Sequence, residues 1–159
     1  MNQKPRLSPD EIVGAPSALY TERRHVRFQD IDAAGIIYFA RVQEYFHDAF
    51  VGFCRQVGID LPEIIAKGKW GLPLAHAEAD YMLPLRFGDE IVVELVWALP
   101  SERSITLVYR ARTEDGRVRA VGQMVHVCID RETFRPMNLP AELRAVLTPA
   151  GQGPGAAEG

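Results

Sequence analysis

The run from Asp30 to Phe39 combines two carboxylates, small side chains and a glycine where a predicted strand gives way to a predicted helix. The first turn of a helix leaves backbone N–H groups without partners and carries the positive end of the helix dipole. Such a position binds anions, and it can stabilise the oxyanion that forms when a carbonyl group is attacked. A carboxylate beside it can act as a nucleophile or as the general base that activates water.

A plainer interpretation of the same residues is open. Aspartate is a preferred N-cap residue, so Asp30 or Asp32 could do no more than cap the helix that follows. Gly35 fits a need for close backbone approach or for an unusual dihedral angle. Spacing alone does not decide between a capping and a catalytic carboxylate.

Two elements must position this run. Alternating apolar and polar residues predict a strand over Tyr20–Phe28. Apolar residues at steps of one, three and four predict one long helix from Ile37 to Val57 with a wide apolar face. Gly58 is placed to end that helix.

Four further alternating stretches follow, after a short helical segment predicted over Leu61–Lys67. Their apolar positions fall within 75–81, 91–97, 105–109 and 121–129, and alanines at 75, 77 and 79 predict a face that the helix approaches closely. Asp115-Gly116 predicts a tight hairpin between the third and the fourth stretch. One helix packed on an antiparallel sheet is an α+β architecture, whose open face and edges we expect a partner subunit to cover.

The chain of 159 residues fits one folded domain. Proline, glycine and polar residues are concentrated at both ends, so we expect a flexible arm over 1–18, the domain over 19–146 and a disordered tail over 147–159. No apolar stretch approaches the roughly 18 residues of a membrane span. The first 16 residues lack the apolar segment of a secretory signal. These features predict a cytoplasmic protein with no membrane partner.

Charge and composition argue against several other classes. Lys and Arg number 18 against 21 Asp and Glu, so the basic surface of a general nucleic-acid binder is not expected. Cys54 and Cys128 are too few for a disulfide framework or a zinc site. None of the four histidines has a ligand-like spacing to another His, Cys or acid. We therefore expect no metal and no nucleic-acid partner.

The motif Asp-x-Asp-x-x-Gly-Ile-Ile-Tyr-Phe over 30–39, leading into an aromatic-rich helix, resembles the hotdog-fold acyl-CoA thioesterases of the 4-hydroxybenzoyl-CoA thioesterase type. Pro84 and Gly88-Asp89, before a Val-rich strand, are similar to that family as well. The stretches 72–77 and 126–129 look closer to one subgroup, the 1,4-dihydroxy-2-naphthoyl-CoA thioesterases of menaquinone or phylloquinone biosynthesis. The resemblance covers 20–130 and implies an antiparallel sheet wrapped around one long central helix.

The resemblance implies a hydrolase that cleaves an acyl-CoA thioester to the free acid and CoA. Asp32 matches the family's catalytic carboxylate, which either attacks the thioester carbonyl or activates water, and the sequence does not choose between these roles. Asp30 matches a position without a chemical role, which leaves it a structural, capping role. The backbone around Gly35, Tyr38 and Phe39 matches the place where the family polarises the carbonyl. Coenzyme A is part of the substrate, and no separate cofactor is implied.

The same resemblance carries expectations for two more residues and for the assembly. His76 lies in a stretch similar to the subgroup and is expected to line the acyl pocket. Arg103, in the loop 101–104, matches the region that contacts the CoA phosphates, although the family is more basic there and Glu102 departs from it. The family implies a homodimer or homotetramer with the site at the subunit interface.

The acyl group and the reaction class leave alternatives open. The aromatic helix and the subgroup resemblance favour an aromatic acyl group, and the alternative is a short or medium aliphatic acyl-CoA or an acyl-carrier-protein thioester. Hydratases of this fold need a histidine paired with an acid, whereas the first histidine after Asp32 is His47. A non-catalytic acyl-CoA binding module is the third reading, and the retained Asp32 argues against it.

Overall fold

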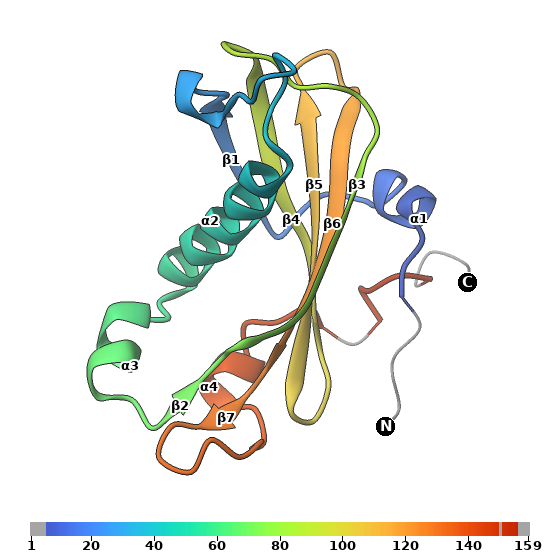
Figure 1. Cartoon of the computed structure of the whole chain (residues 1–159). Helices are drawn as coiled ribbons and strands as arrows, with labels where there is room; N and C mark the ends of the chain where they lie inside the picture. Colours follow the sequence, from blue (N-terminus) through green and yellow to red (C-terminus); the bar gives the residue numbers. More distant parts are fainter. Residues whose placement is uncertain (1–5, 150, 156–159) are drawn as a thin grey trace.

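The computed structural model describes residues 6–149 and 151–155 (Figure 1). In chain order its elements are α1 (Pro9–Val13), β1 (Tyr20–His25), the short 3-10 helix η1 (Phe28–Asp30), α2 (Phe39–Val57), α3 (Leu61–Lys67), β2 (Trp70–Gly71), β3 (Leu74–Tyr81), β4 (Glu90–Pro100), β5 (Ser104–Thr113), β6 (Val118–Val127), β7 (Ile129–Asp130) and α4 (Ala141–Arg144).

The main layer is a five-stranded antiparallel sheet with strand order β1-β4-β5-β6-β3. The long helix α2 crosses one face of this sheet, and the short helix α1 packs against β5 and β6 on the other side (Figure 1). This arrangement confirms the predicted α+β hotdog fold. Within the described ranges, no helix is both long and apolar enough to cross a bilayer.

The helix α2 follows from the spacing of its apolar residues. Its buried face consists of Val42, Tyr45, Phe46, Ala49, Phe50, Phe53 and Cys54. Gly58 adopts a left-handed φ of 84° and ends the helix, as predicted. The helix begins at Phe39 rather than at the predicted Ile37, because Tyr38 has an extended backbone with a ψ of 129° and Ile37 forms a bridge with Ile31.

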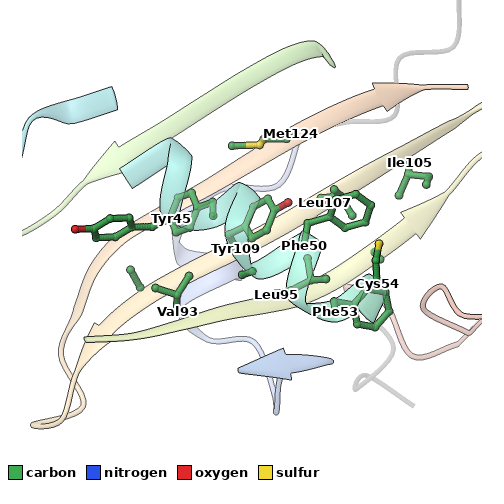
Figure 2. Close-up of a cluster of buried hydrophobic side chains, with 14 of the residues drawn as sticks. Tyr45, Phe50, Phe53, Cys54, Val93, Leu95, Ile105, Leu107, Tyr109 and Met124 are labelled. Carbon is green, nitrogen blue, oxygen red and sulfur yellow. The ribbon is translucent and has the colours of Figure 1, made fainter. Parts of the chain in front are cut away.

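The apolar face of α2 packs on side chains of β4, β5 and β6 (Figure 2). Phe46 stacks on Tyr109 with the two ring centroids 5.0 Å apart. Gly122 of β6 makes this approach possible, because a Cβ at that position would lie 2.7 Å from the ring of Phe46. The absent side chain therefore sets the distance between the helix and the sheet.

The strand β3 forms one edge of the sheet, and its two faces differ. Ala77 and Ala79 pair with Met124 and Gly122 of β6, which places these alanines on the side of α2. A register shift at Ala75 interrupts the predicted alternation at that position. The prediction of a small-residue face that the helix approaches is therefore confirmed at positions 77 and 79 but not at 75.

The N-terminal segment packs on the sheet face opposite α2, so the prediction of a loose arm is wrong for residues 6–18. Ile12 of α1 is 1% exposed in a cluster with apolar residues of β4, β5 and β6. The guanidinium of Arg110 donates to carbonyl oxygens at the end of α1 and pairs with the buried Glu94 at 2.6 Å. These long-range contacts outweigh the polar composition from which the arm was predicted, and residues 1–5 lie outside the described part.

The start of the predicted tail is also ordered. Leu147 is buried, the N–H of Thr148 donates to the carbonyl of Ala98 at 2.9 Å, and the Thr148 hydroxyl accepts from the N–H of Ala98 at 2.8 Å. Thr148 therefore bonds to the edge of β4 at Ala98, beyond Leu95, where the pairing with the first residue of β1 stops. Residues 150 and 156–159 of the predicted tail lie outside the described residues.

Replacing Gly122 with alanine tests the packing of the helix on the sheet. We expect Gly122→Ala to lower the free energy of unfolding by about 1–3 kcal/mol, because the added methyl group must displace the Phe46 ring. Urea denaturation measures this change. The matched control is Gly14→Ala, whose Cβ would lie 3.4 Å from its nearest neighbour, the carbonyl oxygen of Asp10, at ordinary van der Waals distance. Equal stability of Gly122→Ala and wild type would contradict the packing argument.

Candidate active site

The loop between β1 and α2 holds Asp32 in a tight turn. Its Oδ1 accepts a hydrogen bond from the N–H of Ala34 at 2.8 Å. The N–H of Gly35 donates to the carbonyl of Asp32 at 3.0 Å, and Gly35 has a φ of 78°, a left-handed value that favours glycine. Among the described residues, Oδ2 of Asp32 has no hydrogen-bond partner, so this oxygen is free to act on a substrate.

The same loop folds back on itself, which brings Asp32 close to the start of α2. Ile31 and Ile37 form an antiparallel bridge, and the N–H of Asp32 donates to the carbonyl of Ile36 at 3.0 Å. The bridge closes the loop two residues before Phe39, the first residue of α2. A half-buried carboxylate and a helix N-terminus are therefore neighbours.

The backbone amides at the predicted oxyanion positions differ in availability. The N–H of Tyr38 donates to the carbonyl of Asp30 at 2.8 Å, and the N–H of Gly35 is bonded within the turn, so neither is free. The N–H groups of Phe39 and Ala40 have no acceptor in the part of the chain that the structure describes, as expected in the first turn of a helix. Phe39 is thus the one of the three predicted positions whose N–H can donate, and sequence reasoning missed Ala40.

Asp30 is fully buried, and its carboxylate connects the loop to Arg27, just after β1, and to Tyr45 on α2. Its carboxylate accepts hydrogen bonds from Nε and Nη2 of Arg27 at 2.9 and 3.0 Å, and from the hydroxyl of Tyr45 on α2. Nε of Arg41 lies 3.7 Å from the same carboxylate. Asp30 has a structural role, but it caps η1 through the N–H of Arg27 at 3.1 Å and does not cap α2.

The protonation states of this cluster follow from its contacts. Burial raises the pKa of the Asp30 carboxyl, but the hydrogen bonds from Arg27 and Tyr45 and the charge of Arg27 outweigh burial, so the pKa falls from 3.8 to about 2. Burial and the bond to Asp30 raise the pKa of the Tyr45 hydroxyl from 10.0 to about 12. At neutral pH, Asp30 is therefore a carboxylate and Tyr45 a neutral donor.

Exposed aromatic side chains flank the loop. The rings of Phe28 and Phe87 pack edge to face at 5.8 Å, and those of Tyr38 and Phe39 lie 4.7 Å apart. Phe28 is 78% exposed and Phe87 63%, although the sequence placed Phe28 in a half-buried strand and gave no signal for Phe87. Exposed apolar clusters of this kind mark ligand or partner contacts.

The structure places His76 on the sheet face opposite α2. Its Nε2 lies 3.0 Å from the carboxylate of Glu78, and its Nδ1 lies 3.5 Å from Arg6 of the N-terminal segment. The neighbouring Ala77 faces α2. The sheet therefore separates His76 from α2 in this chain, and the predicted acyl-pocket role gains no support from its position.

The connection between β4 and β5, which carries Arg103, lies at the far end of the sheet from the connection between β1 and α2 (Figure 1). It follows the last residue of β4, whereas the loop of Asp32 follows β1, whose final residue pairs with the first residue of β4. The 11 residues of β4 span about 35 Å. The Nε of Arg103 donates to Asn138 at 3.3 Å. One chain does not bring Arg103 and Asp32 together.

The arrangement as a whole suits attack on a carbonyl group. Asp32 offers a free carboxylate oxygen, and the start of α2 offers free N–H donors for the oxygen that becomes negative. In residues 6–149 and 151–155, no three His, Cys, Asp or Glu side chains gather in a way that could hold a metal ion.

Comparison with known proteins places the chain among thioesterases. Residues 26–147 match the model of the thioesterase-like superfamily. A 1,4-dihydroxy-2-naphthoyl-CoA hydrolase from Synechococcus elongatus is 32% identical to the chain over 126 residues, which cover 79% of this chain and 92% of that protein. This similarity confirms the family resemblance predicted from the motif over 30–39.

Solved structures show the same relationship. A 1,4-dihydroxy-2-naphthoyl-CoA thioesterase from Synechocystis has a TM-score of 0.76 at 29% identity, and the match covers 80% of this chain and 93% of that one. A gentisyl-coenzyme A thioesterase has a TM-score of 0.71 at 26% identity, over 78% of this chain and 98% of that one.

The Asp30 cluster predicts a specific dependence of stability on pH. A carboxyl whose pKa is lowered in the folded state stabilises the fold above its unfolded pKa, and this contribution is lost as the pH falls from about 4 towards 2. We expect Asp30→Asn to lower the free energy of unfolding by about 2–3 kcal/mol at pH 7, and the difference from wild type to shrink below pH 4.

Urea denaturation at several pH values measures this difference. The control is Asp80→Asn, because Asp80 is an exposed acid and should tolerate the change at every pH. An Asp30→Asn protein as stable as wild type at pH 7 would contradict the structural role of the cluster.

Proposed function

This chain belongs to the thioesterase-like superfamily, and we propose that it is an acyl-CoA thioesterase that hydrolyses 1,4-dihydroxy-2-naphthoyl-CoA to the free acid and coenzyme A. The observation that carries the proposal is the unpartnered Oδ2 of Asp32 next to the free N–H groups at the start of α2, all within the described residues. The relatives named for the naphthoyl ester in Synechococcus and Synechocystis support this acyl group.

The start of α2 is the proposed binding place of the thioester oxygen. The N–H groups of Phe39 and Ala40 would donate to it, and the helix dipole adds positive potential at the same point. These donors stabilise the oxyanion more than the ground-state carbonyl, and one such donor contributes about 3–4 kcal/mol to catalysis in other hydrolases.

Asp32 has two routes open to it. As a general base, its Oδ2 takes a proton from water while the water oxygen bonds to the carbonyl carbon; the tetrahedral intermediate then expels the CoA thiolate, which is protonated. As a nucleophile, Oδ2 bonds to the carbonyl carbon and expels the thiolate, and water hydrolyses the resulting mixed anhydride. Either route needs no group beyond water and the CoA ester itself.

We expect a second copy of the chain to complete the site. The strand β3 is a sheet edge, and its last residue, Tyr81, is more than one-third exposed, as are Met82 and Leu83, which follow it. A second chain at this edge would cover the apolar side chains and the free backbone groups. Arg103 could then contact CoA bound at the partner's Asp32. A homodimer is the smallest such assembly, and a homotetramer is the alternative.

Substitution of Asp32 tests the assigned chemistry. We expect Asp32→Asn to lower kcat for the naphthoyl ester by about 100-fold or more, because the amide can neither attack the thioester nor accept a proton from water. CoA release, followed with a thiol reagent over a panel of aroyl-CoA and fatty acyl-CoA esters, measures the effect.

The matched control is Asp10→Asn, which removes an exposed acid from α1 and should turn over like wild type. Near-normal turnover by Asp32→Asn would exclude Asp32 as the catalytic carboxylate. Faster cleavage of hexanoyl-CoA than of any aroyl-CoA would exclude the aromatic substrate.

Association of the chain is tested by sedimentation. At micromolar concentration we expect a species at least twice the 17.8 kDa chain mass, and Met82→Asp should weaken it by placing a charge beside the β3 edge. Ile65→Asp, at an exposed apolar residue of α3, is the control and should leave the mass unchanged. A stable monomer of the wild-type chain would contradict the shared site.

A further inference from the structure

The first turn of α2 has no side-chain cap within the described part of the chain. Its N-cap residue, Tyr38, makes no capping hydrogen bond, and the first turn contains no acid. In a capped helix a side-chain oxygen accepts from one of the first N–H groups and helps to fix the start of the helix. Since the N–H groups of Phe39 and Ala40 have no acceptor among the described residues, other contacts must fix their orientation.

Tyr81 supplies one such contact from the edge strand β3. Its hydroxyl donates to the carbonyl oxygen of Phe39 at 2.6 Å. Ala77 and Ala79 lie on the α2 side of β3, and position 81 falls on the same face because side chains alternate along a strand. The edge of the sheet thus holds the first residue of α2 by its carbonyl group.

The bonded carbonyl belongs to the same peptide group as one of the free donors. A peptide group joins the carbonyl of one residue to the N–H of the next in one rigid plane, so the carbonyl of Phe39 and the N–H of Ala40 turn together. A hydrogen bond to this carbonyl therefore fixes the direction of the Ala40 N–H. It also polarises the peptide group, which strengthens the N–H as a donor by on the order of 10–30%.

The Tyr81 hydroxyl is a donor throughout the neutral pH range. Burial raises its pKa above the ordinary value of 10.0, so the hydroxyl keeps its proton. The residue as a whole is 46% exposed, and phenylalanine at this position would keep the ring with its contacts. The hydroxyl can therefore be removed without opening a cavity in the core.

We propose that Tyr81 is a positioning residue for the oxyanion, acting through the peptide group of Phe39 and Ala40 on the N–H of Ala40. This inference rests on the proposed function, in which that N–H donates to the thioester oxygen. As negative charge develops on this oxygen, the polarised N–H binds it more strongly, so the effect of Tyr81 falls on the transition state rather than on substrate binding. Tyr81 acts without touching the substrate.

Tyr81→Phe tests the proposal, because it removes the hydroxyl and keeps the ring. We expect kcat for 1,4-dihydroxy-2-naphthoyl-CoA to fall by about 3- to 10-fold, the effect of one neutral hydrogen bond, while KM stays within about 2-fold of wild type. CoA release measures both constants. The melting temperature and the sedimentation mass verify that the fold and the assembly are retained.

Tyr20→Phe is the matched control. Tyr20 begins β1, and its hydroxyl donates to the carboxylate of Glu22 at 3.2 Å, so its removal should leave kcat and KM unchanged. A wild-type kcat in Tyr81→Phe, or a raised KM with kcat unchanged, would overturn the positioning role and leave the thioesterase activity standing. If wild type releases no CoA from any ester of the panel, the proposed function fails and this inference fails with it.

A spectroscopic readout reports on the donor directly. Asp32→Asn is expected to bind the ester without cleaving it, so Raman difference spectra can measure the stretching frequency of an isotope-labelled thioester carbonyl in the site. Hydrogen bonds to the carbonyl oxygen lower this frequency. We expect the added Tyr81→Phe change to return the frequency part of the way to its value in solution, and an added Tyr20→Phe change to leave it unaltered. Equal frequencies with and without the Tyr81 hydroxyl would overturn the proposal, even where kcat falls.

Discussion

A buried carboxylate governs the geometry of the candidate site. Asp30 joins Arg27 after β1 to Tyr45 inside α2, and its backbone carbonyl holds the N–H of Tyr38 just before the helix. A buried charge that loses its partners is costly, so the loop cannot rearrange without unpairing Asp30. The turn of Asp32 and the free N–H of Phe39 therefore owe their positions to a residue that does not touch the substrate.

The sequence alone predicted the helices and strands whose apolar residues recur at a regular spacing. Period-two and helical patterns predicted the strands and α2, and the Asp115-Gly116 turn is present with a φ of 82° at Gly116. The predictions that failed concern segments held in place by residues far away in the chain. The N-terminal arm was expected to be loose because its composition is polar, but the carbonyl oxygens of Val13 and Ala15, at the end of α1 and just after it, accept from Arg110, nearly a hundred residues away. No local pattern reports a contact of that separation.

For the candidate site, too, the sequence predicted the local features but not those that depend on tertiary packing. The motif identified Asp32 and the start of α2, because a strand, a turn and a helix follow one another directly in the chain. Alternation in β3 indicated that His76 and Ala77 point to opposite sides, but it did not say which side meets α2. The motif could not show that the N–H of Tyr38 is bonded while those of Phe39 and Ala40 have no acceptor among the described residues, since hydrogen-bond pairing is a property of the packed structure.

The two edges of the sheet differ in their chemistry. β1 carries charged residues on both faces, from Glu22 to Arg24, whereas β3 is charged on one face and carries alanines on the other. Charges along an edge strand discourage the addition of another strand. A sheet extended at β3 by a second chain ends in two β1 edges, and further strands are repelled at both. If two chains assemble through β3 as proposed, the strand order β1-β4-β5-β6-β3 makes extension of the sheet self-limiting, because the first step uses the edge that accepts a partner.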